Sequence, residues 1–329
     1  MKVKAVNFVI FGTDADFFTP FTDAFLQMPN VVYNQGRIHV SSSIIRLIYK
    51  LHMSTQLNRV VKLPFKSIWN GLYYRNEFSD MHNLCFLFFA NRYWMCDVNY
   101  PAYLKRHYPG CKLVIMFNDV VDKYFERFPS FSIDYVRKNF DLVLTYNKLD
   151  EAKYGFQYYP TFWSRIPVNE NTKFPESDIL YVGAAKDRLG QLLSCYGFFI
   201  EHGLKCDFHI TGVPQNKQKY ADRISYNKPI SYNEVLERVQ RTKCVLEISQ
   251  QGALGFTPRT MEAILYNKKL ISNNPILIGT KFYNKNYVFY FSQIDDIDIE
   301  MIKKIDKVDF GYNGEYSPDK LLKFIEEVL

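Results

Sequence analysis

Short apolar runs alternate with amphipathic stretches along the whole chain. In the first half, the runs with the length of buried strands are AVNFVIFG, VVYN, CFLFFA, KLVIMFND and DLVLTYN. Helices are predicted near residues 17–28, over SSSIIRLIYKLHM behind a Ser cap, and over YPAYLKRHYPG with its end at Gly110. Strands that alternate with helices build layered α/β structures around a mostly parallel sheet.

The second half repeats this alternation as a separate series. Its strands are predicted at ILYVGAA, CDFHITG, CVLEIS and LISNN, and its helices at RLGQLLSCYGFFIEHGL, SYNEVLERVQRTK, PRTMEAILYNKK and SPDKLLKFIEEVL. Between the two series, YYPTFWSRIPVNENTKFPESD interrupts both patterns with prolines and polar residues. The sequence therefore predicts an α/β protein with two Rossmann-like domains, 1–160 and 161–329. Ligands are expected in a cleft at the carboxyl ends of the strands.

Composition agrees with two globular domains. The 329 residues suit two cores, and a hydrophobic fraction of 47% excludes disorder as the main state. No run approaches the roughly 18 to 20 apolar residues of a membrane helix, and the first residues read as a strand and not as a signal peptide. The cysteines form no CxxC pair and no zinc spacing, so we expect a cytoplasmic protein with buried thiols.

The net charge of +7 lies entirely in the first half of the chain. Residues 1–165 contain 20 Lys and Arg against 13 Asp and Glu, and no acidic residue stands between Asp23 and Glu77. This basic window, residues 37–75, fits a solvated face, an anionic membrane surface or a nucleic-acid surface. It lacks a nucleic-acid recognition motif, so we expect no nucleic-acid partner.

One predicted helix favours the membrane among these alternatives. The spacing of Ile44, Leu47, Ile48 and Leu51 places them on one helical face, with Arg46 and Lys50 beside it. Basic amphipathic helices bind anionic bilayers through such faces.

Candidate ligand chemistry first appears in the loop Gly183-Ala-Ala-Lys186-Asp187-Arg188, between a strand and a long helix. Small residues allow close backbone approach, the helix start offers free N–H groups, and Lys186 and Arg188 add positive charge. This pattern suits a phosphate group, and the alternative is a plain turn with solvated basic residues. It is neither GxGxxG nor a Walker loop, which disfavours a dinucleotide cofactor or a P-loop enzyme.

The second loop, QQGALGFTPRT, precedes another predicted helix. The N–H groups around Gly255, Phe256 and Thr257 are expected to bind a diphosphate, with Arg259 neutralising its charge. Glu262, on the first turn of the helix, is expected to accept hydrogen bonds from ribose hydroxyls. The alternative for Glu262 is a carboxylate favoured by the helix dipole. Because both loops end neighbouring strands, together they predict a nucleotide-diphosphate site.

The segment QQGALGFTPRTMEAILYNKKLISNN resembles the donor site of two-domain GT-B glycosyltransferases. It is most similar to a bacterial family of capsular polysaccharide and lipopolysaccharide biosynthesis with the pattern G-x-T-x-R-x-x-E-A followed by K-K-L-I. The stretches DLVLTYNKLDEAKYGFQYYPTFWS and DILYVGAAKDRLGQLL resemble the same family, so the likeness lies mostly in 140–275.

The resemblance implies that Glu262 binds ribose and that Arg188 and Arg259 face the diphosphate. It also implies the GT-B arrangement, in which the C-terminal helix can cross back to the first domain. The Glu-x7-Glu pattern of a well-known retaining group is absent, because Leu254 stands eight residues before Glu262. Retention of configuration is therefore not implied.

By analogy, the segment KPISY lies where GT-B donor domains pass the nucleotide base, with Tyr232 near that base. A helix start capped by Ser231, with Glu234 as its capping-box partner, explains the same residues.

An inverting enzyme also needs a catalytic base, expected at a strand end of the first domain. The candidates are Asp14, Asp16, Asp119 and His39. The alternative roles are a turn or helix cap for Asp14 or Asp16, a strand-end cap for Asp119 and a structural residue for His39. The remaining histidines are interpreted as structural.

These features together favour a metal-independent hexosyltransferase-type glycosyltransferase that needs no cofactor. Its donor would be a nucleotide sugar, with UDP slightly favoured over GDP. The acceptor would be a cell-surface glycan or a lipid-linked acceptor, reached in the cytoplasm or on the inner face of the plasma membrane. The alternatives are another sugar-nucleotide enzyme such as a 2-epimerase, and a non-catalytic glycan- or membrane-binding protein.

Overall fold

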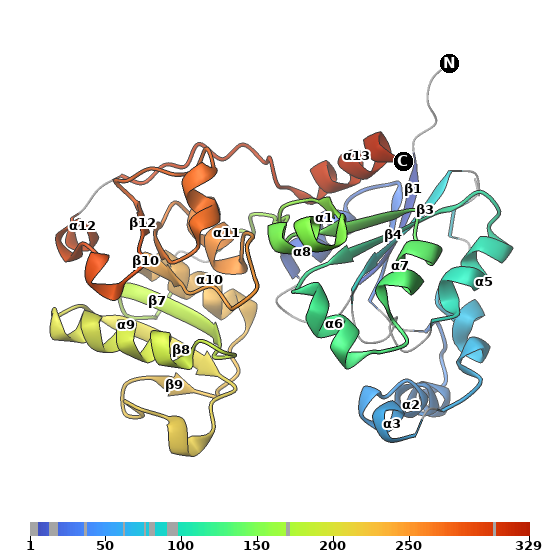
Figure 1. The fold of residues 1–329 in the computed structure, drawn as a ribbon, viewed down its shortest axis with the longest axis horizontal. Coiled ribbons are helices and arrows are strands. Elements are labelled where there is room, and N and C mark those ends of the chain that lie inside the picture. The colour runs from blue at the N-terminus through green and yellow to red at the C-terminus, as the bar shows by residue number, and fades with distance from the viewer. Residues whose placement is uncertain are drawn as a thin grey trace. The chain divides into compact units, whose positions relative to one another are not determined.

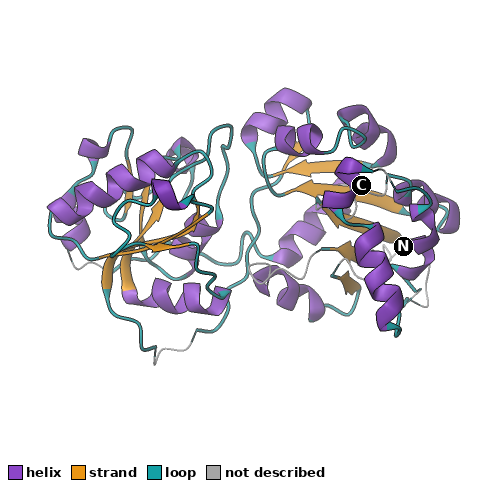
Figure 2. Ribbon diagram, turned by 90° about the horizontal axis from the view of Figure 1, so that it is seen from below, coloured by secondary structure: helices purple, strands orange, loops and turns teal. Residues whose placement is uncertain are grey.

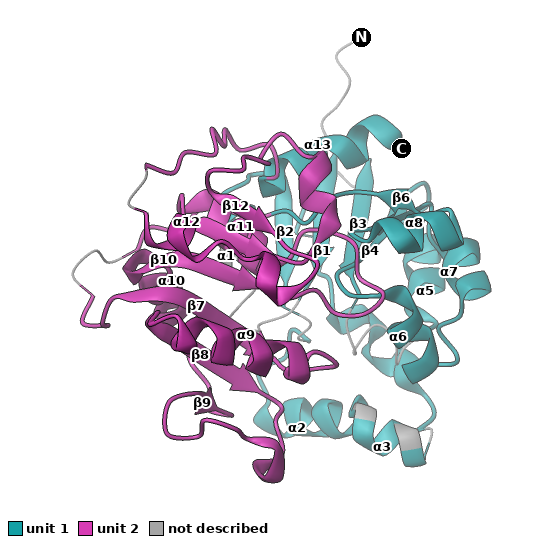
Figure 3. Ribbon diagram, turned by 60° about the vertical axis from the view of Figure 1, so that its left-hand side comes forward, with its two compact units in different colours: residues 1–162, 317–329 teal, residues 163–316 magenta. Residues whose placement is uncertain are grey.

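The fold is seen in a computed structural model that describes residues 6–12, 19–35, 38–61, 63–75, 77–78, 83–90, 98–168, 172–304 and 307–329. The chain forms two compact units (Figure 3). Unit 1 comprises Met1–Phe162 together with Ser317–Leu329, and unit 2 comprises Trp163–Tyr316. The chain thus leaves unit 1 close to the expected division at residue 160, and its last segment, Ser317–Leu329, returns there.

Unit 1 is built on a six-stranded sheet whose order is β2-β1-β3-β4-β5-β6, with every neighbouring pair parallel (Figure 1). Its strands are β1 (Asn7–Phe11), β2 (Val31–Asn34), β3 (Leu84–Phe89), β4 (Lys112–Phe117), β5 (Leu142–Thr145) and β6 (Gln157–Tyr158). All six residues of β3 are buried, as expected for an inner strand of a sheet covered on both faces.

Helices cover both faces of this sheet (Figure 2). The helices of unit 1 are α1 (Thr19–Leu26), α2 (Ser43–His52), α3 (Thr55–Val60), η2 (Lys66–Leu72), α5 (Tyr100–His107), α6 (Val121–Arg127), α7 (Ile133–Asn139), α8 (Lys148–Tyr154) and α13 (Pro318–Val328), of which α2 and α3 lie away from the sheet (Figure 1). The predicted Ser cap of α2 is Ser42, whose side chain accepts from the N–H of Ile45.

The C-terminal helix α13 belongs to unit 1, which confirms that the chain crosses back. Leu321 and Ile325 are fully buried, and the rings of Tyr159 and Phe324 lie 5.0 Å apart. Pro318 stands at the first turn, where its missing N–H is not needed.

Unit 2 repeats the architecture with the strand order β12-β11-β10-β7-β8-β9, again with parallel neighbours. Its strands are β7 (Ser177–Ala184), β8 (Cys206–Thr211), β9 (Ser225–Tyr226), β10 (Thr242–Glu247), β11 (Lys269–Ser272) and β12 (Val288–Tyr290). Its helices are α9 (Leu189–Glu201), η3 (Gln215–Lys217), α10 (Tyr232–Arg241), α11 (Pro258–Leu265), η4 (Pro275–Gly279), η5 (Ile294–Asp296) and α12 (Ile299–Lys303). The predicted two-domain α/β fold is thus confirmed.

The strand orders locate the expected ligand sites. In unit 2 the chain proceeds outward from β7 through β8 to β9, and from β10 through β11 to β12 in the opposite direction. Such a reversal leaves a crevice at the carboxyl ends of the two central strands, where α/β proteins bind their ligands. The loops that follow β7 and β10 are the two loops singled out in the sequence. The corresponding strands of unit 1 are β1 and β3.

Two helices end earlier than their patterns predict. Helix α5 stops at His107, because Pro109 disfavours helical backbone at Tyr108, and Gly110 serves a later turn with φ +84°. Helix α11 stops at Leu265, since Asn267 adopts a left-handed φ of +51° and turns the chain into β11.

Among the described residues, no helix combines the length and the apolarity needed to cross a membrane.

Candidate functional site

The two candidate loops of unit 2 are joined to each other by side chains. The Lys186 ammonium donates to Oε1 of Gln250 at 2.8 Å, and the N–H of Gln251 donates to Oδ2 of Asp187 at 2.7 Å. Lys186 itself has a left-handed φ of +46°, a conformation that carries a local cost for a residue with a side chain. The loop after β7 and the loop after β10 therefore form one structure.

Arg188 adds a third connection and is buried. Its Nη1 donates to the carbonyl of Ile248 at 2.5 Å and its Nη2 to the carbonyl of Ala184 at 3.0 Å. Its Nε is buried without a hydrogen-bond partner. Burial, followed by the nearby Arg259 cation, lowers the pKa of the Arg188 guanidinium.

Arg259 is the second guanidinium of the site. Its Nη1 donates to the carbonyl of Val182 at 3.1 Å, and its centre lies 5.5 Å from the Tyr181 ring. Its Nε, like that of Arg188, is buried and has no hydrogen-bond partner. Two neighbouring cations, each with an unpaired buried donor, favour the binding of an anion between the carboxyl ends of β7 and β10.

Gly183 allows this arrangement. A Cβ at this position would lie 2.9 Å from Nη1 of Arg259 and 3.1 Å from the Tyr181 hydroxyl. A side chain here would therefore displace the guanidinium.

The nucleotide-diphosphate site predicted from the sequence can be tested at this position: Gly183→Ala should weaken UDP affinity by about 10-fold, which is roughly the contribution of one charge-assisted hydrogen bond. Isothermal titration with UDP measures this effect. Gly190→Ala is the matched control, because a Cβ on Gly190 meets no atom within 4 Å. Equal affinities of the two variants would show that the position of Arg259 does not matter for binding.

Glu247 holds the second loop in place, a role that the sequence analysis missed. Its buried carboxylate, at the end of β10, accepts from the hydroxyls of Thr260 at 2.7 Å and Ser272 at 2.5 Å, and from that of Thr257. Thr257 also caps α11, and Pro258 fills its first position. A charged residue inside the apolar run CVLEIS was the available signal, since such a residue requires partners when buried.

Two asparagines after β11 support the same loop from the other side. The Asn274 amide donates to the carbonyl of Gly255 at 2.9 Å, and Oδ1 of Asn273 accepts from the N–H of Ser249 at 2.7 Å. Phe256 is buried and packs against the Tyr316 ring at 5.6 Å. In the sequence, the two asparagines that end LISNN were the signal for this support of the loop.

Glu262 is buried at the first turns of α11 and belongs to a hydrogen-bonded chain. Nε1 of Trp163 donates to the Tyr232 hydroxyl at 3.1 Å, and the Tyr232 hydroxyl donates to the Glu262 carboxylate. Burial raises the pKa of Glu262 to about 7, although Arg259 and the Tyr232 hydrogen bond oppose the shift. Burial likewise raises the pKa of Tyr232 well above its usual value. Near neutral pH the Glu262 carboxyl group is therefore partly protonated. Hydrogen bonds from two hydroxyl donors would stabilise its charged form.

The helix start near KPISY has the predicted cap but only half of a capping box. The Ser231 hydroxyl accepts from the N–H of Glu234 at 3.2 Å. The Glu234 carboxylate pairs with Arg238 at 2.9 Å. Tyr232, the candidate base contact, lies buried against Glu262 and Trp163.

In unit 1, two of the four candidate bases, Asp14 and Asp16, lie outside the described residues. Asp119 follows β4, and its Oδ1 accepts from the N–H of Val120 at 2.9 Å. His39 is exposed after β2, with Nε2 3.4 Å from the Asn34 amide nitrogen. The structure thus places Asp119 and His39 near the carboxyl ends of different strands.

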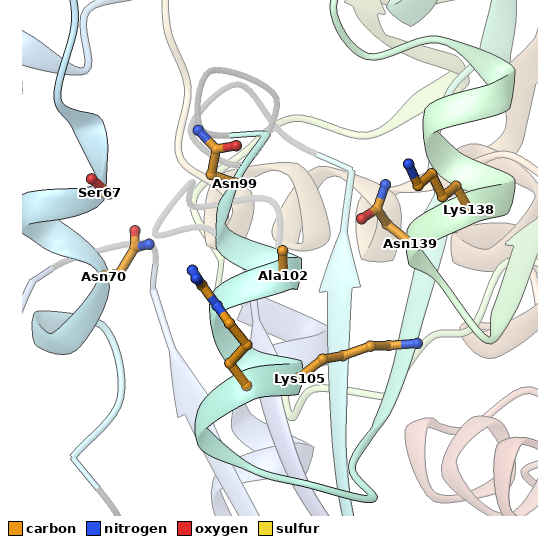
Figure 4. Close-up of a pocket in the computed structure, with 8 residues that line it drawn as sticks. Ser67, Asn70, Asn99, Ala102, Lys105, Lys138 and Asn139 are labelled. Atoms are coloured by element: carbon orange, nitrogen blue, oxygen red, sulfur yellow. The ribbon is translucent and has the colours of Figure 1, made fainter.

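Unit 1 also has an open cavity of about 640 Å³ between η2, α5 and α7 (Figure 4). It is lined by Ser67, Asn70, Asn99, Ala102, Lys105, Arg106, Lys138 and Asn139. Oδ1 of Asn70 is buried there without a hydrogen-bond partner. This lining offers cations and amides, and it includes none of the candidate bases.

Within the part of the chain that the structure describes, no three His, Cys, Asp or Glu side chains come together as a set of metal ligands.

Comparisons with known proteins bear on the fold. No family model matches this sequence, and no curated protein matches it significantly. Among solved structures, it is similar to a trehalose-6-phosphate synthase, with a TM-score of 0.55, 8% identity and 98% of each chain covered. It is also similar to an α-glucosyltransferase in complex with UDP and a 13-mer DNA, with a TM-score of 0.52 and 13% identity over 98% of this chain and 96% of that one.

The chain has the two-domain GT-B fold. A putative UDP-N-acetylglucosamine 2-epimerase from Listeria monocytogenes shares this fold. Its TM-score is 0.50 at 10% identity, covering 98% of this chain and 96% of that one. At such identities these likenesses show the fold and leave the reaction to the residues of the site.

Proposed function

We propose that the protein is a metal-independent glycosyltransferase that uses a nucleotide-sugar donor bound in unit 2. The observation that carries this proposal is the pair of guanidiniums, Arg188 and Arg259, whose buried Nε atoms lack partners at the carboxyl ends of β7 and β10. A diphosphate supplies the acceptors that both groups need. The resemblance of QQGALGFTPRTMEA to GT-B donor segments supports the same assignment.

The proposed chemistry follows from charge development during sugar transfer. As the bond between the anomeric carbon and the diphosphate breaks, negative charge grows on the leaving oxygen. Arg259 and the N–H groups around Gly255, Phe256 and Thr257 would stabilise that charge without a metal ion. Lys186 would add charge at the edge of the site, and Gly183 leaves space for Arg259. The Glu262 carboxylate would accept hydrogen bonds from the ribose hydroxyls, with Tyr232 fixing its orientation.

The acceptor hydroxyl must lose a proton as it attacks, and we assign the base to unit 1. Asp14 and Asp16 are the leading candidates, because they follow β1, one of the two strands where the order of unit 1 reverses. Asp119 and His39 are the others. Each is tested by its Asn or Gln variant, which should lower kcat while leaving donor affinity unchanged.

For the substrates, we propose a UDP-sugar as donor, in preference to a GDP-sugar. The acceptor is a cell-surface glycan or a lipid-linked glycan of capsule or lipopolysaccharide type. Transfer would take place in the cytoplasm, with the enzyme peripheral on the inner face of the plasma membrane. This assignment is supported by the sequence resemblance and by the basic first half of the chain.

The testing experiment is a thermal-shift panel of UDP, GDP, CMP and dTDP, each with magnesium and with a chelator. At a nucleotide concentration of about 100 Kd, binding adds about 2.7 kcal/mol of stability, and a unit of this size should melt roughly 5 to 10 °C higher. We expect the largest shift with UDP and no dependence on magnesium. If no nucleotide raises the melting temperature, the proposal fails. Inversion of the configuration at C2 of UDP-N-acetylglucosamine, without an acceptor and without release of the sugar, would instead establish a 2-epimerase.

A further inference from the structure

Large exposed apolar side chains are concentrated in one segment of unit 1. Of the 16 large hydrophobic residues that the structure shows exposed, ten lie between residues 44 and 68. We call them the α2–η2 surface; they are Ile44, Ile45, Leu47, Ile48, Leu51, Leu57, Val60, Val61, Phe65 and Ile68. Singly scattered apolar residues are normal on a protein surface, whereas so many within 25 consecutive residues indicate an interaction site.

Helix α2 turns its apolar face outward. Ile44, Leu47, Ile48 and Leu51 share one face, and each is between 51% and 71% exposed. The opposite face carries Tyr49, which is buried and lies 5.4 Å from the Trp69 ring. A surface helix of a globular protein normally buries its apolar stripe, so the exposed stripe of α2 is available for an interaction outside the core of unit 1.

The segment beneath this surface is held by specific contacts. Nε1 of Trp69 donates to Nδ1 of His52 at 2.9 Å. The Lys66 ammonium donates to Oδ1 of Asn58 at 2.5 Å and to the Leu63 carbonyl at 2.7 Å. These bonds tie α2, α3 and η2 into one piece, so the apolar side chains are presented outward by ordered structure.

The charges around the surface are positive. Arg46 and Lys50 are exposed on α2 and form no ion pair with any described residue, and no acid stands between Asp23 and Glu77. Helix η2 contributes to both features, because Ser67 lines the cavity of unit 1 and the next residue, Ile68, belongs to the α2–η2 surface. Two cations of the cavity, Arg106 and Lys138, also lack an ion pair within the described ranges. A partner with negative charge at its surface and an apolar interior complements this arrangement.

We propose that the α2–η2 surface docks on an anionic lipid bilayer, with its aliphatic side chains inserted at the boundary between headgroups and acyl chains. Nine of the ten side chains are aliphatic, whereas the centres of protein interfaces are enriched in aromatic residues. Arg46 and Lys50 lie at headgroup level, and Arg106 and Lys138 bind lipid phosphates from the cavity. This inference deepens the membrane part of the proposed function and is independent of the donor site.

Docking by insertion makes a different prediction from docking by charge alone. Ile48→Gln with Leu51→Gln removes apolar area from an exposed face, and Gln keeps good helix propensity, so the fold should persist. We expect this variant to bind vesicles containing about one third phosphatidylglycerol at least 10-fold more weakly than the wild type. Arg46→Gln with Lys50→Gln should reduce the same binding by roughly 10-fold and remove much of its salt dependence.

Co-sedimentation with sucrose-loaded vesicles measures these partition coefficients. Leu149→Gln with Ile278→Gln is the matched control, since both residues are 47% exposed and lie outside the surface. It should bind as the wild type does. UDP binding, measured on every variant, should not change, which separates this proposal from the donor-site assignment.

Several results would overturn the proposal. The first is a wild type that stays in the supernatant with anionic vesicles, and the second is an Ile48→Gln, Leu51→Gln variant that sediments as well as the control. A wild-type dimer that this variant converts to a monomer would identify a second copy of the chain as the partner. Binding of duplex DNA that depends on Arg46 and Lys50 but not on Ile48 and Leu51 would identify a nucleic-acid surface.

Discussion

Replacing Glu262 by Ala is expected to raise the donor KM and to lower kcat/KM by about 10- to 100-fold. The variant loses two hydrogen bonds to the ribose, which together contribute roughly 1.4 to 2.7 kcal/mol net. It also leaves the Tyr232 hydroxyl, which donates to this carboxylate, without its acceptor. Steady-state kinetics against the nucleotide sugar measure the effect, and far-UV circular dichroism should be unchanged. Wild-type kinetics in this variant would exclude a role of Glu262 in binding ribose.

The pH dependence of binding supplies a second readout for the same residue. The pKa of Glu262 is raised to about 7, so the free protein carries a neutral carboxyl below that pH and a carboxylate above it. Ribose binding favours the carboxylate, and affinity for UDP-glucose should therefore rise from about pH 6 to about pH 8.5 by up to roughly 10-fold. Glu262→Gln should abolish this dependence, whereas Glu300→Gln, at an exposed site, should retain it. A wild type without pH dependence would contradict the assignment.

The effect of Glu262 on stability has the opposite sign. Because its folded-state pKa lies above its unfolded value of about 4.5, its stabilising contribution is complete below about pH 4.5 and is lost as the pH rises to about 7. Without ligand, Glu262→Gln should therefore be more stable than the wild type at about pH 8 but not at about pH 4.5. Thermal unfolding of both proteins at these two pH values measures the difference.

Replacing Glu247 by Ala is expected to destabilise unit 2 by roughly 3 kcal/mol or more. The change leaves the hydroxyls of Thr257, Thr260 and Ser272 without their acceptor in a buried site, and each unpaired group costs about 1 to 3 kcal/mol. For a unit of this size, the melting temperature should fall by roughly 6 to 12 °C. UDP affinity should fall as well, because Thr257 no longer holds the loop.

Calorimetry of Glu247→Ala and Glu247→Gln measures this effect. The Gln variant retains one acceptor oxygen and should lose about half as much stability. Glu300→Ala is the control, since the Glu300 side chain is 84% exposed. A Glu247→Ala variant as stable as this control would show that the three hydroxyls find other partners.

Periodicity located the central strands of both sheets, because buried parallel strands read as continuous apolar runs such as CFLFFA and CVLEIS. Short elements such as α3 and β9 were not predicted, because so few residues do not show a recognisable hydrophobic period. The two donor loops were found because glycine, hydroxyl and arginine residues cluster directly after strands. The structure confirms that these loops follow neighbouring strands, because β7 pairs with β10.

The sequence could not reveal the partners of individual side chains. The sequence predicts that Arg188 faces a diphosphate or is solvated, whereas the structure shows its guanidinium buried with two carbonyl acceptors, which no pattern indicated. Tyr232 and Glu262 lie on different helices, α10 and α11, and only the folded structure joins them to Trp163 through hydrogen bonds. The apolar stripe of α2 was visible in the sequence, but its exposure depends on which face packs on Trp69. These properties arise from tertiary contacts, which local patterns do not encode.

The return of α13 to unit 1 has a consequence for synthesis on the ribosome. Residues 163–316 emerge as a continuous block, so unit 2 has its whole sequence available before unit 1 does. Unit 1 must wait for Ser317–Leu329, whose Leu321 and Ile325 complete its packing. Until then the earlier part of unit 1 exposes the apolar surface that α13 later covers, and nascent chains stalled before Ser317 should engage chaperones more than the released protein does.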